Sequence, residues 1–187
     1  MSQCCKSQLD TTNMPESICG WPSLHEGGRF PPANTRLAQR LLSIALGEEI
    51  VPDGVFTSAT TDQIKEFQAL VGDAVDGYLN IDTWPDLIMV ATPLELGATG
   101  VAVEALQDTL IWNGFEVVIN GVYDDQTANA TKQFQLSRGS TLVSGETVDA
   151  PTWHLLTTQC NSTGSPGLFW FDAGWPQGNL TGPCVVC

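Results

Sequence analysis

The chain contains an internal duplication, in which residues of the same kind recur at a nearly constant separation. The matching pairs and their separations are Gln39 and Gln107 (68), Asp53 and Asn120 (67), Phe67 and Phe134 (67), and Trp84 and Trp153 (69). Self-similarity at a fixed spacing is typical of a structural unit that occurs more than once. The middle of this chain of 187 residues must therefore fold as two copies of one small unit.

The second copy has the apolar spacing of three short helices. The first predicted helix carries one apolar stripe and ends at Gly114, and the second and third are capped by acidic residues. Pro151 suits the first turn of the third helix. The residues expected to face inward are Val103, Leu106, Leu110 and Ile111 on the first helix, Ala128, Thr131 and Phe134 on the second, which is capped by Asp124 or Asp125, and Trp153 and Leu156 on the third, which is capped by Asp149.

The first copy follows the same order with more departures. Its apolar and turn residues are Leu41, Leu42 and Ile44 on a helix ending at Gly47, the turn Asp53-Gly54, Ile64, Phe67 and Gln68 on a second helix, and Asp76-Gly77 and Thr83-Trp84 before a third. Pro85 falls where the third helix should run, so we expect that helix to start late or to bend. Both copies are predicted to be helical throughout.

The second copy resembles the peptidoglycan-binding domain type 1 family. The residues that carry the resemblance are Gly100, Val103, Leu106-Gln107, Leu110, Gly121, Tyr123, Thr127, Phe134-Gln135, Gly145, Thr152-Trp153 and Leu156. The first copy, 35–88, is more degenerate and lacks the leading glycine motif. The resemblance implies a small three-helix bundle that is not catalytic itself and is often attached to a cell-wall hydrolase.

These patterns predict an all-α fold of two tandem three-helix bundles between irregular arms. The expected boundaries are an N-terminal arm at 1–33, the first repeat at 34–91, the second repeat at 94–158 and a C-terminal arm at 159–187. Matching positions such as Phe134 and Trp153 are core positions. They indicate a fold, whereas a function has to be argued from a site.

All six cysteines lie in the two arms, and none lies between Cys19 and Cys160. They are Cys4, Cys5 and Cys19 at one end and Cys160, Cys184 and Cys187 at the other. This segregation favours disulfides over zinc ligands or free thiols, and the C-x-x-C spacing at the C-terminus lacks the context of a redox motif. Each arm holds an odd number. If all six are oxidised within one chain, at least one bridge must join the two arms, stabilising the fold by roughly 5 kcal/mol; otherwise a bridge joins two chains.

The C-terminal arm is rich in glycine and aromatic residues and carries Asp172 as its one charge. Its aromatic residues are Phe169, Trp170, Phe171 and Trp175. An aromatic segment is unfavourable in water, so it either folds back over the helices or docks on a neighbouring subunit. Three acceptor sequences for N-glycosylation also occur, at Asn129, Asn161 and Asn179, and Asn129 falls on a predicted helix.

Charge and motifs exclude several classes of function. The formal net charge of −14 argues against nucleic acid and anionic membranes, because both are bound by clustered cations. No apolar run is long enough to cross a bilayer. The two histidines, His25 and His154, belong to no catalytic or metal-ligating motif, and Asp124-Asp125 is explained by helix capping. We therefore expect no enzyme activity, no metal and no cofactor.

The leading functional hypothesis is an extracellular structural subunit. It would be N-glycosylated and would form a head-to-tail homo-polymer through its disulfide-bonded arms. The start of the chain lacks the pattern of a secretory leader, so this hypothesis takes the sequence as a mature secreted chain. The alternative is a module that binds peptidoglycan or another wall polysaccharide near its second and third helices, with aromatic residues such as Tyr123 stacking on sugars. Such a module could be an accessory of a wall hydrolase.

Overall fold

The computed structural model describes residues 21–138 and 147–158, and these residues form six α-helices. The helices are α1 (Pro32–Leu46), α2 (Ser58–Val71), α3 (Thr83–Met89), α4 (Val101–Trp112), α5 (Asp125–Ser137) and α6 (Ala150–Thr157). Between them the described residues contain isolated β-bridges and no longer strand. The predicted all-α fold of two tandem three-helix repeats is confirmed.

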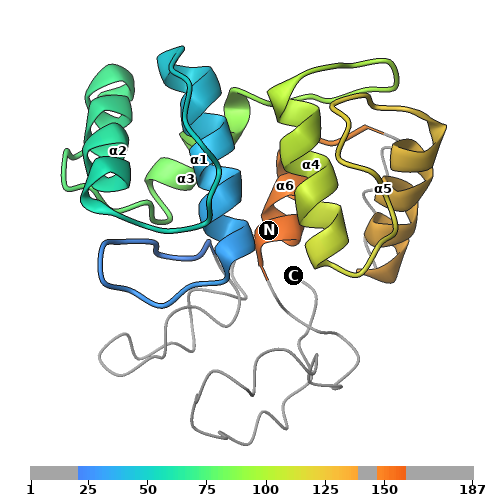
Figure 1. The fold of residues 1–187 in the computed structure, drawn as a ribbon, viewed down its shortest axis with the longest axis horizontal. Coiled ribbons are helices and arrows are strands. Elements are labelled where there is room, and N and C mark those ends of the chain that lie inside the picture. The colour runs from blue at the N-terminus through green and yellow to red at the C-terminus, as the bar shows by residue number, and fades with distance from the viewer. Residues whose placement is uncertain (1–20, 139–146, 159–187) are drawn as a thin grey trace, which may run out of the picture.

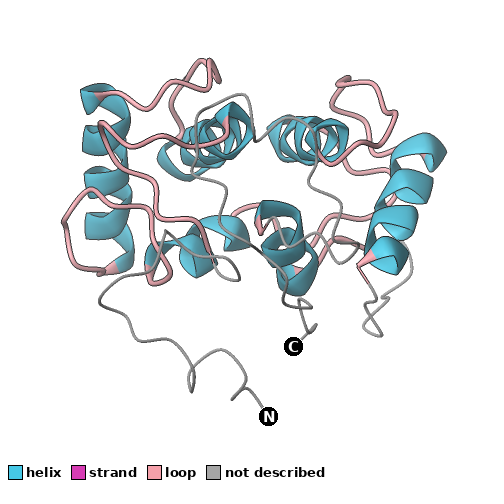
Figure 2. Cartoon of the chain, turned by 90° about the horizontal axis from the view of Figure 1, so that it is seen from below, coloured by secondary structure: helices cyan, strands magenta, loops and turns pink. Residues whose placement is uncertain are grey.

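Equivalent helices of the two repeats pack against each other at the centre of the molecule. Helix α1 packs mainly on α4, and α3 contacts α6. Helices α2 and α5 lie at opposite ends, as Figure 1 shows. Seen from below in Figure 2, α2 and α5 stand upright at the two edges with the other four helices between them. The two repeats are thus arranged around an approximate twofold axis.

Short-range signals set the helix ends as predicted. Gly47 follows α1 with a left-handed φ of 69°, a conformation that glycine adopts readily. Asp124 and Asp149 cap α5 and α6, each accepting a bond of 2.9 Å from the backbone N–H three residues later. The expectation that the third helix of the first copy starts late is correct: α3 begins at Thr83, one residue before Trp84, whereas α6 begins three residues before Trp153, and Pro85 is the third residue of α3. The first N–H groups of a helix have no partner inside the helix, so proline is tolerated there.

A buried glutamine holds the turn after each of the first two helices of both repeats. Gln107 Nε2 donates to Asn120 Oδ1 at 2.9 Å and to the Thr127 hydroxyl at 3.1 Å, and its Oε1 accepts from the Asn120 and Gly121 N–H groups, each at 3.0 Å. The equivalent glutamines are Gln39, which holds the turn at 53–55, Gln68, which holds 76–78, and Gln135, which bonds to Thr147 and Thr152. These bonds satisfy buried polar groups that would otherwise be unpaired.

The first repeat extends further toward the N-terminus than the predicted boundary at 33/34. Leu24 is fully buried and forms an antiparallel bridge with Leu79, and the Trp84 indole N–H donates to the Pro22 carbonyl at 2.6 Å. The second repeat has the same two features: Leu94 bridges Val148, and the Trp153 indole donates to the Ala91 carbonyl at 3.4 Å. Residues 21–33 therefore pack as the leading segment of the first repeat.

The first copy does lack the leading glycine of the pattern, because Pro31 precedes α1 where Gly100 precedes α4, but the leading segment shares another glycine with the second repeat. Gly27 follows Leu24 by three residues and has a φ of 79°, just as Gly97 follows Leu94 and has a φ of 89°. The spacing of this segment differs between the repeats, because Gln39 follows Leu24 by 15 residues and Gln107 follows Leu94 by 13. An alignment at constant spacing therefore places Gly27 out of register.

The core consists of the apolar residues predicted from periodicity, together with the leading leucines. Trp84, Trp153 and Phe134 are fully buried, and Thr131 is buried with its hydroxyl bonded to the Thr127 carbonyl. Ile111 is an exception, because 43% of its surface is exposed. It lies beside the buried Leu110 at the edge of the stripe on α4.

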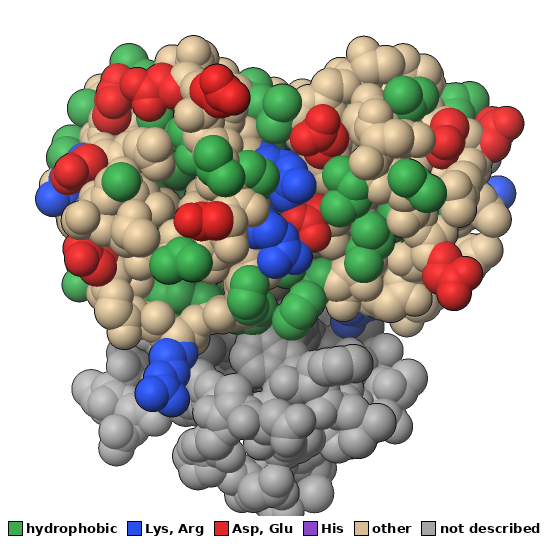
Figure 3. Space-filling model, in the orientation of Figure 1, with side chains coloured by type: hydrophobic (Ala, Val, Ile, Leu, Met, Phe, Trp, Pro, Cys, Tyr) green, Lys and Arg blue, Asp and Glu red, His purple; other side chains and the backbone are tan. Residues whose placement is uncertain are grey.

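The seam between the repeats contains paired charges. Arg36 Nε and Arg40 Nη1 donate to Asp108 Oδ2 at 2.7 and 2.5 Å, and Arg36 Nη2 donates to Asp108 Oδ1 at 2.8 Å. Arg40 also lies 3.9 Å from Glu104. Figure 3 shows basic side chains at the centre of the face, between the two lobes. The ion pairs join α1 to α4.

Candidate functional site

Four aromatic rings of the first repeat lie in a row across its leading segment and its two turns. We call Tyr78, His25, Phe30 and Phe56 the aromatic row. The ring centroids of His25 and Tyr78 are 5.2 Å apart, those of His25 and Phe30 are 5.3 Å apart, and those of Phe30 and Phe56 are 6.3 Å apart. Such tilted and edge-to-face contacts are favourable between aromatic rings.

The row is partly open to solvent. Tyr78 exposes 45% of its surface, and the other three members are half-buried. Aromatic side chains that remain partly exposed next to one another are a feature of binding surfaces, because a protein gains stability by covering them. The arrangement can therefore present ring faces and edges to a ligand with apolar patches.

Three separate segments position the row. His25 and Phe30 belong to the leading segment, Phe56 precedes α2, and Tyr78 belongs to the turn held by Gln68, which donates to the Tyr78 carbonyl at 3.0 Å. Gly28 lies directly beneath the Phe30 ring, where a Cβ atom would clash with it. The backbone thus places rings from distant parts of the sequence side by side.

The second repeat has no equivalent surface in its described residues. The position of Tyr78 is taken by Thr147, whose carbonyl accepts from Gln135 as that of Tyr78 accepts from Gln68. The position of Phe56 is taken by Tyr123, one repeat period later in the chain. The row is therefore a property of the first, more degenerate repeat.

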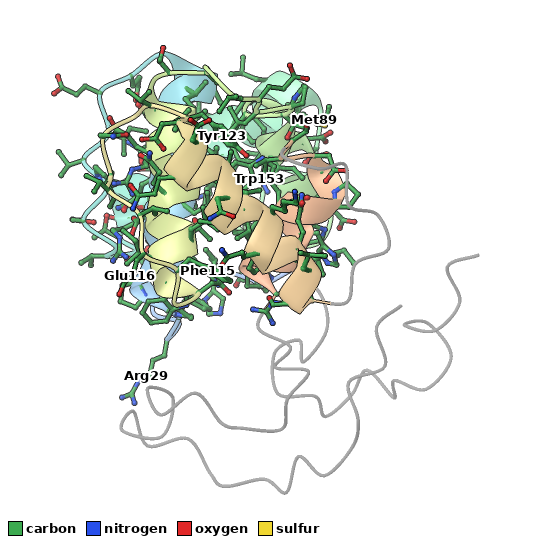
Figure 4. All side chains as sticks on the ribbon, turned by 90° about the vertical axis from the view of Figure 1, so that its right-hand side faces the viewer. Arg29, Met89, Phe115, Glu116, Tyr123 and Trp153 are labelled. Carbon is green, nitrogen blue, oxygen red and sulfur yellow. The ribbon has the colours of Figure 1, made fainter. Side chains whose placement is uncertain are left out.

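The suggestion that Tyr123 stacks on sugar rings is wrong. Tyr123 is fully buried. Its backbone pairs with the leading segment of the second repeat, which precedes α4: the Tyr123 carbonyl accepts from the Gly97 N–H at 2.8 Å, and the Tyr123 N–H donates to the Ala98 carbonyl at 2.9 Å. Figure 4 shows Tyr123 and Trp153 within the packed body, while Arg29 extends away from it. This backbone pairing holds the Tyr123 ring inside the fold, whereas the sequence pattern did not indicate whether the ring was buried or exposed.

A second aromatic cluster lies where the repeats meet. Trp21 stacks on Trp84, with ring centroids 5.7 Å apart, and its ring lies 4.6 Å from that of His154 on α6. Burial lowers the pKa of His154 below its ordinary value, so this imidazole is held neutral at neutral pH. This position fits the structural role that the sequence suggested for it.

Three carboxyl groups have lowered pKa values with structural causes. A hydrogen bond from Gln39 lowers the pKa of Asp53, and the Thr127 backbone N–H lowers that of Asp124 at the start of α5. Burial would raise the pKa of Asp108, but its bonds to Arg36 and Arg40 outweigh burial and lower it. Each group is engaged in a turn, a cap or the seam, and none is poised as a catalytic acid.

Most of the site residues predicted from sequence lie outside the described residues. These are the six cysteines Cys4, Cys5, Cys19, Cys160, Cys184 and Cys187, the acceptors Asn161 and Asn179, and the arm residues Phe169, Trp170, Phe171 and Trp175. Asn129 is described: it is exposed on α5, and Gln133 donates to its side-chain oxygen at 3.3 Å. His25 joins the aromatic row.

Within the described ranges, no three histidine, cysteine or acidic side chains gather in a way that could hold a metal ion. Over the same ranges, no helix combines the length and the apolar character that a membrane span requires.

Comparison with protein families identifies the repeat. The family model described as "Putative peptidoglycan binding domain" matches the chain twice, at residues 32–85 and 99–156. The chain belongs to the peptidoglycan-binding domain family. Neither the curated proteins nor the solved structures contain a significant match. The two family matches coincide with the two helical repeats, which confirms the resemblance noted in the sequence.

Sequence reasoning missed Tyr78, Phe30 and Phe56 as surface candidates. The available signal was the difference between the copies, since Tyr78 stands where the second repeat of this member of the peptidoglycan-binding domain family has Thr147. Phe30 lies in the leading segment that is two positions longer in the first repeat. For Tyr78 and Phe30, the differences between the two copies marked the surface better than the residues shared by both.

Proposed function

We propose that this protein is a non-catalytic module that binds a cell-wall glycan, and that the aromatic row of its first repeat is the binding surface. The family supplies the class of ligand, because its domains are described as binding peptidoglycan. The observation that carries the proposal is the run of ring contacts from Tyr78 to Phe56, which stays partly open to solvent.

The chemistry of the row fits a sugar polymer. Sugar rings present apolar C–H faces that pack on aromatic rings, and the Tyr78 hydroxyl offers a polar group at the exposed end of the row. A row of rings suits an extended chain better than a single small molecule. The net charge of −14 disfavours strongly anionic polymers and favours neutral stretches of glycan.

Retention on insoluble wall material tests this function. The full chain is mixed with insoluble peptidoglycan and, separately, with chitin, and the bound fraction is measured. We expect retention on at least one polymer and a loss of about tenfold or more in the double variant Tyr78→Ala/Phe30→Ala. Leu136→Ala is the matched control, because Leu136 is 58% exposed on α5, away from the row. No retention on either polymer would rule out the function.

The sequence also supports a second candidate, the extracellular head-to-tail homo-polymer. Its basis is the odd number of cysteines in each arm, together with the aromatic residues of the C-terminal arm and the N-glycosylation acceptors. The two functions are compatible, since a wall-associated matrix could be built from subunits that also bind glycan. An accessory role beside a wall hydrolase would equally use the binding module without catalysis in these repeats.

The mass of native material under denaturing conditions, before and after reduction, tests the polymer. A ladder that collapses to one chain on reduction would support disulfide-linked assembly. A single chain in both samples would exclude covalent polymerisation. Treatment with a glycosidase that removes N-linked glycans, followed by the same mass measurement, tests occupancy of Asn129, Asn161 and Asn179.

A further inference from the structure

We propose that Gly28 is a positioning residue that joins the aromatic row into one continuous surface, so that the first repeat binds an extended oligosaccharide rather than a mono- or disaccharide. This assignment rests on the proposed function of the row, and it names the class of ligand that the row takes. Three features carry it: the ring contacts of Phe30, the turn that precedes Phe30, and the equivalent turn of the second repeat.

Phe30 is the ring that connects the two ends of the row. Its centroid lies 5.3 Å from that of His25, with the ring planes at 81°, and 6.3 Å from that of Phe56, with the planes at 61°. His25 in turn lies 5.2 Å from Tyr78. If the Phe30 ring moved away, Phe56 would be separated from His25 and Tyr78. The row would then become two shorter surfaces.

A β-turn at 25–28 sets the place of the Phe30 ring. The Gly28 N–H donates to the His25 carbonyl at 3.2 Å, and Gly27 occupies the third position of the turn with a φ of 79°. The Phe30 ring lies over Gly28, and the three atoms nearest to a Cβ atom built on Gly28 all belong to the far edge of that ring. Such a Cβ atom would overlap the ring. The ring can therefore occupy this place only because residue 28 has no side chain.

The second repeat contains the same turn with alanine in the position of Gly28. The Ala98 N–H donates to the Glu95 carbonyl at 2.9 Å, as the Gly28 N–H does to the residue three positions before it. This backbone therefore accepts a Cβ atom. The φ of Gly28 also lies outside the left-handed region that favours glycine. The backbone does not require glycine at position 28, and the requirement comes from the Phe30 ring.

A continuous row favours a ligand that touches several rings at once. When one sugar unit is bound, the next unit meets its ring at a high effective concentration, so the affinity rises steeply with chain length. A row divided at Phe30 offers the pair Tyr78 and His25 and, separately, Phe56. The affinity then stops rising at a short chain. The dependence of affinity on the length of the oligosaccharide therefore reports whether the row is continuous.

Calorimetric titration of the full chain with short and long chitin oligosaccharides, and with short and long soluble peptidoglycan fragments, tests this assignment. For the wild type we expect the long form of at least one ligand to bind about tenfold or more tightly than the short form. Gly28→Ala should lose most of this preference and keep its affinity for the short form. Ala98→Gly, the reciprocal change at the equivalent position of the second repeat, is the matched control and should keep the preference.

A double-variant comparison tests whether Gly28 acts through Phe30. In Phe30→Ala the ring is absent, so adding Gly28→Ala should change the affinity no further. A wild-type preference for long chains that persists in Gly28→Ala would overturn the assignment. A further loss on adding Gly28→Ala to Phe30→Ala would overturn it as well.

A measurement without ligand separates failure of this assignment from failure of the proposed function. NMR cross-peaks between the ring protons of Phe30 and those of His25 and Phe56 report the position of the ring. We expect them in the wild type and not in Gly28→Ala, with little change in melting temperature, because the turn accepts a Cβ atom. Cross-peaks that persist in Gly28→Ala would overturn the positioning role, whether or not a glycan binds. Absence of binding by the wild type to all of these ligands would instead overturn the glycan function itself.

Discussion

Arg40 and Asp108 occupy the same position in the two repeats and bind each other. They are separated by one repeat period, and Arg40 Nη1 donates to Asp108 Oδ2 at 2.5 Å. Arg36 and Glu104, four residues earlier in each repeat, are separated by the same interval. Arg36 bonds to Asp108, and Arg40 faces Glu104 at 3.9 Å. The ion pairs therefore follow the approximate twofold axis.

This relationship explains why the repeats pair within one chain. Both seam positions are arginine in the first repeat and acidic in the second. If two first repeats packed in this way, four guanidinium groups would meet at the seam. If two second repeats did so, four carboxylates would meet there. Like charges at a buried contact are unfavourable, so the seam selects the mixed pair.

The first prediction concerns the seam. Asp108→Ala should lower the free energy of unfolding by about 3 kcal/mol, because it leaves two arginines without their carboxylate in a mostly buried position. The double exchange Arg40→Asp/Asp108→Arg should recover part of that loss. Urea denaturation at neutral pH measures both. Equal losses in the double exchange and in Asp108→Ala would contradict a pairing role.

The contribution of Asp108 should also depend on pH in the acid range. Its folded pKa lies below the ordinary value of 3.8, so the unfolded state takes up the proton first. The stabilisation is complete above that ordinary value and is lost as the pH falls through the folded pKa. Wild type and Asp108→Ala should therefore converge in stability under strongly acidic conditions.

The second prediction concerns the glutamine turns. Gln107→Ala should cost about 3 kcal/mol, because several buried groups lose their partners. Among these groups are the Asn120 and Gly121 N–H groups, which donate to the Gln107 side-chain oxygen. Gln133→Ala is the control, since Gln133 is an exposed residue of the same type on α5. The melting temperatures of Gln107→Ala and Gln133→Ala are measured by thermal unfolding, with circular dichroism as the signal. Similar melting temperatures for the two variants would show that the turn is held by other means.

The third prediction uses the lowered pKa of His154. The unfolded chain binds a proton near the ordinary value of 6.5, whereas burial delays protonation in the folded state. The stabilisation is present above about pH 6.5 and declines as the pH falls toward the folded pKa. His154→Phe keeps a ring beside Trp21 and cannot titrate. Its stability, measured in urea on either side of that ordinary value, should change less than that of wild type, and an equal change would contradict the assignment.

The fourth prediction compares two glycines with left-handed backbones. A Cβ at Gly77 would lie 2.7 Å from Thr61 Cγ2, whereas a Cβ at Gly47 would meet nothing within 4 Å. Both alanine variants lose roughly 1 kcal/mol to the positive φ. Gly77→Ala should lose about 1 kcal/mol more from the steric clash. Denaturation midpoints measure the difference in stability. A greater loss for Gly47→Ala than for Gly77→Ala would contradict the prediction, because it would mean that Thr61 on α2 moves away from the added Cβ without cost.

Much of the fold could be predicted from local signals. The spacing of Leu106 and Leu110, the capping residue Asp149 and Gly47 after the first helix all act within a few residues, so their effect can be read from one sequence. Pro85 was a correct signal of the same local kind, because α3 starts only two residues before it and later in its repeat than α6 does. The leading segment was missed because its distance from Gln39 differs between the copies.

The candidate site could not be predicted in this way. Tyr123 and Phe56 occupy equivalent positions, yet Tyr123 is fully buried and Phe56 is half-buried. The difference comes from the neighbouring backbone: the leading segment of the second repeat pairs with Tyr123, while that of the first carries Phe30 against Phe56. Exposure depends on such contacts between distant segments.

The sequence by itself determined the repeat, the helices, the identity of the core residues and the confinement of the cysteines to the arms. These follow from periodicity and from groups that interact within a turn or two of the chain. Only the tertiary structure decided that Arg40 pairs with Asp108, that Tyr78 joins His25 in a row, and that Trp21 lies against His154. Those contacts join residues that are far apart in the chain. Which residues meet depends on how the helices and loops pack, and the spacing of residues in the sequence does not indicate which surfaces come together.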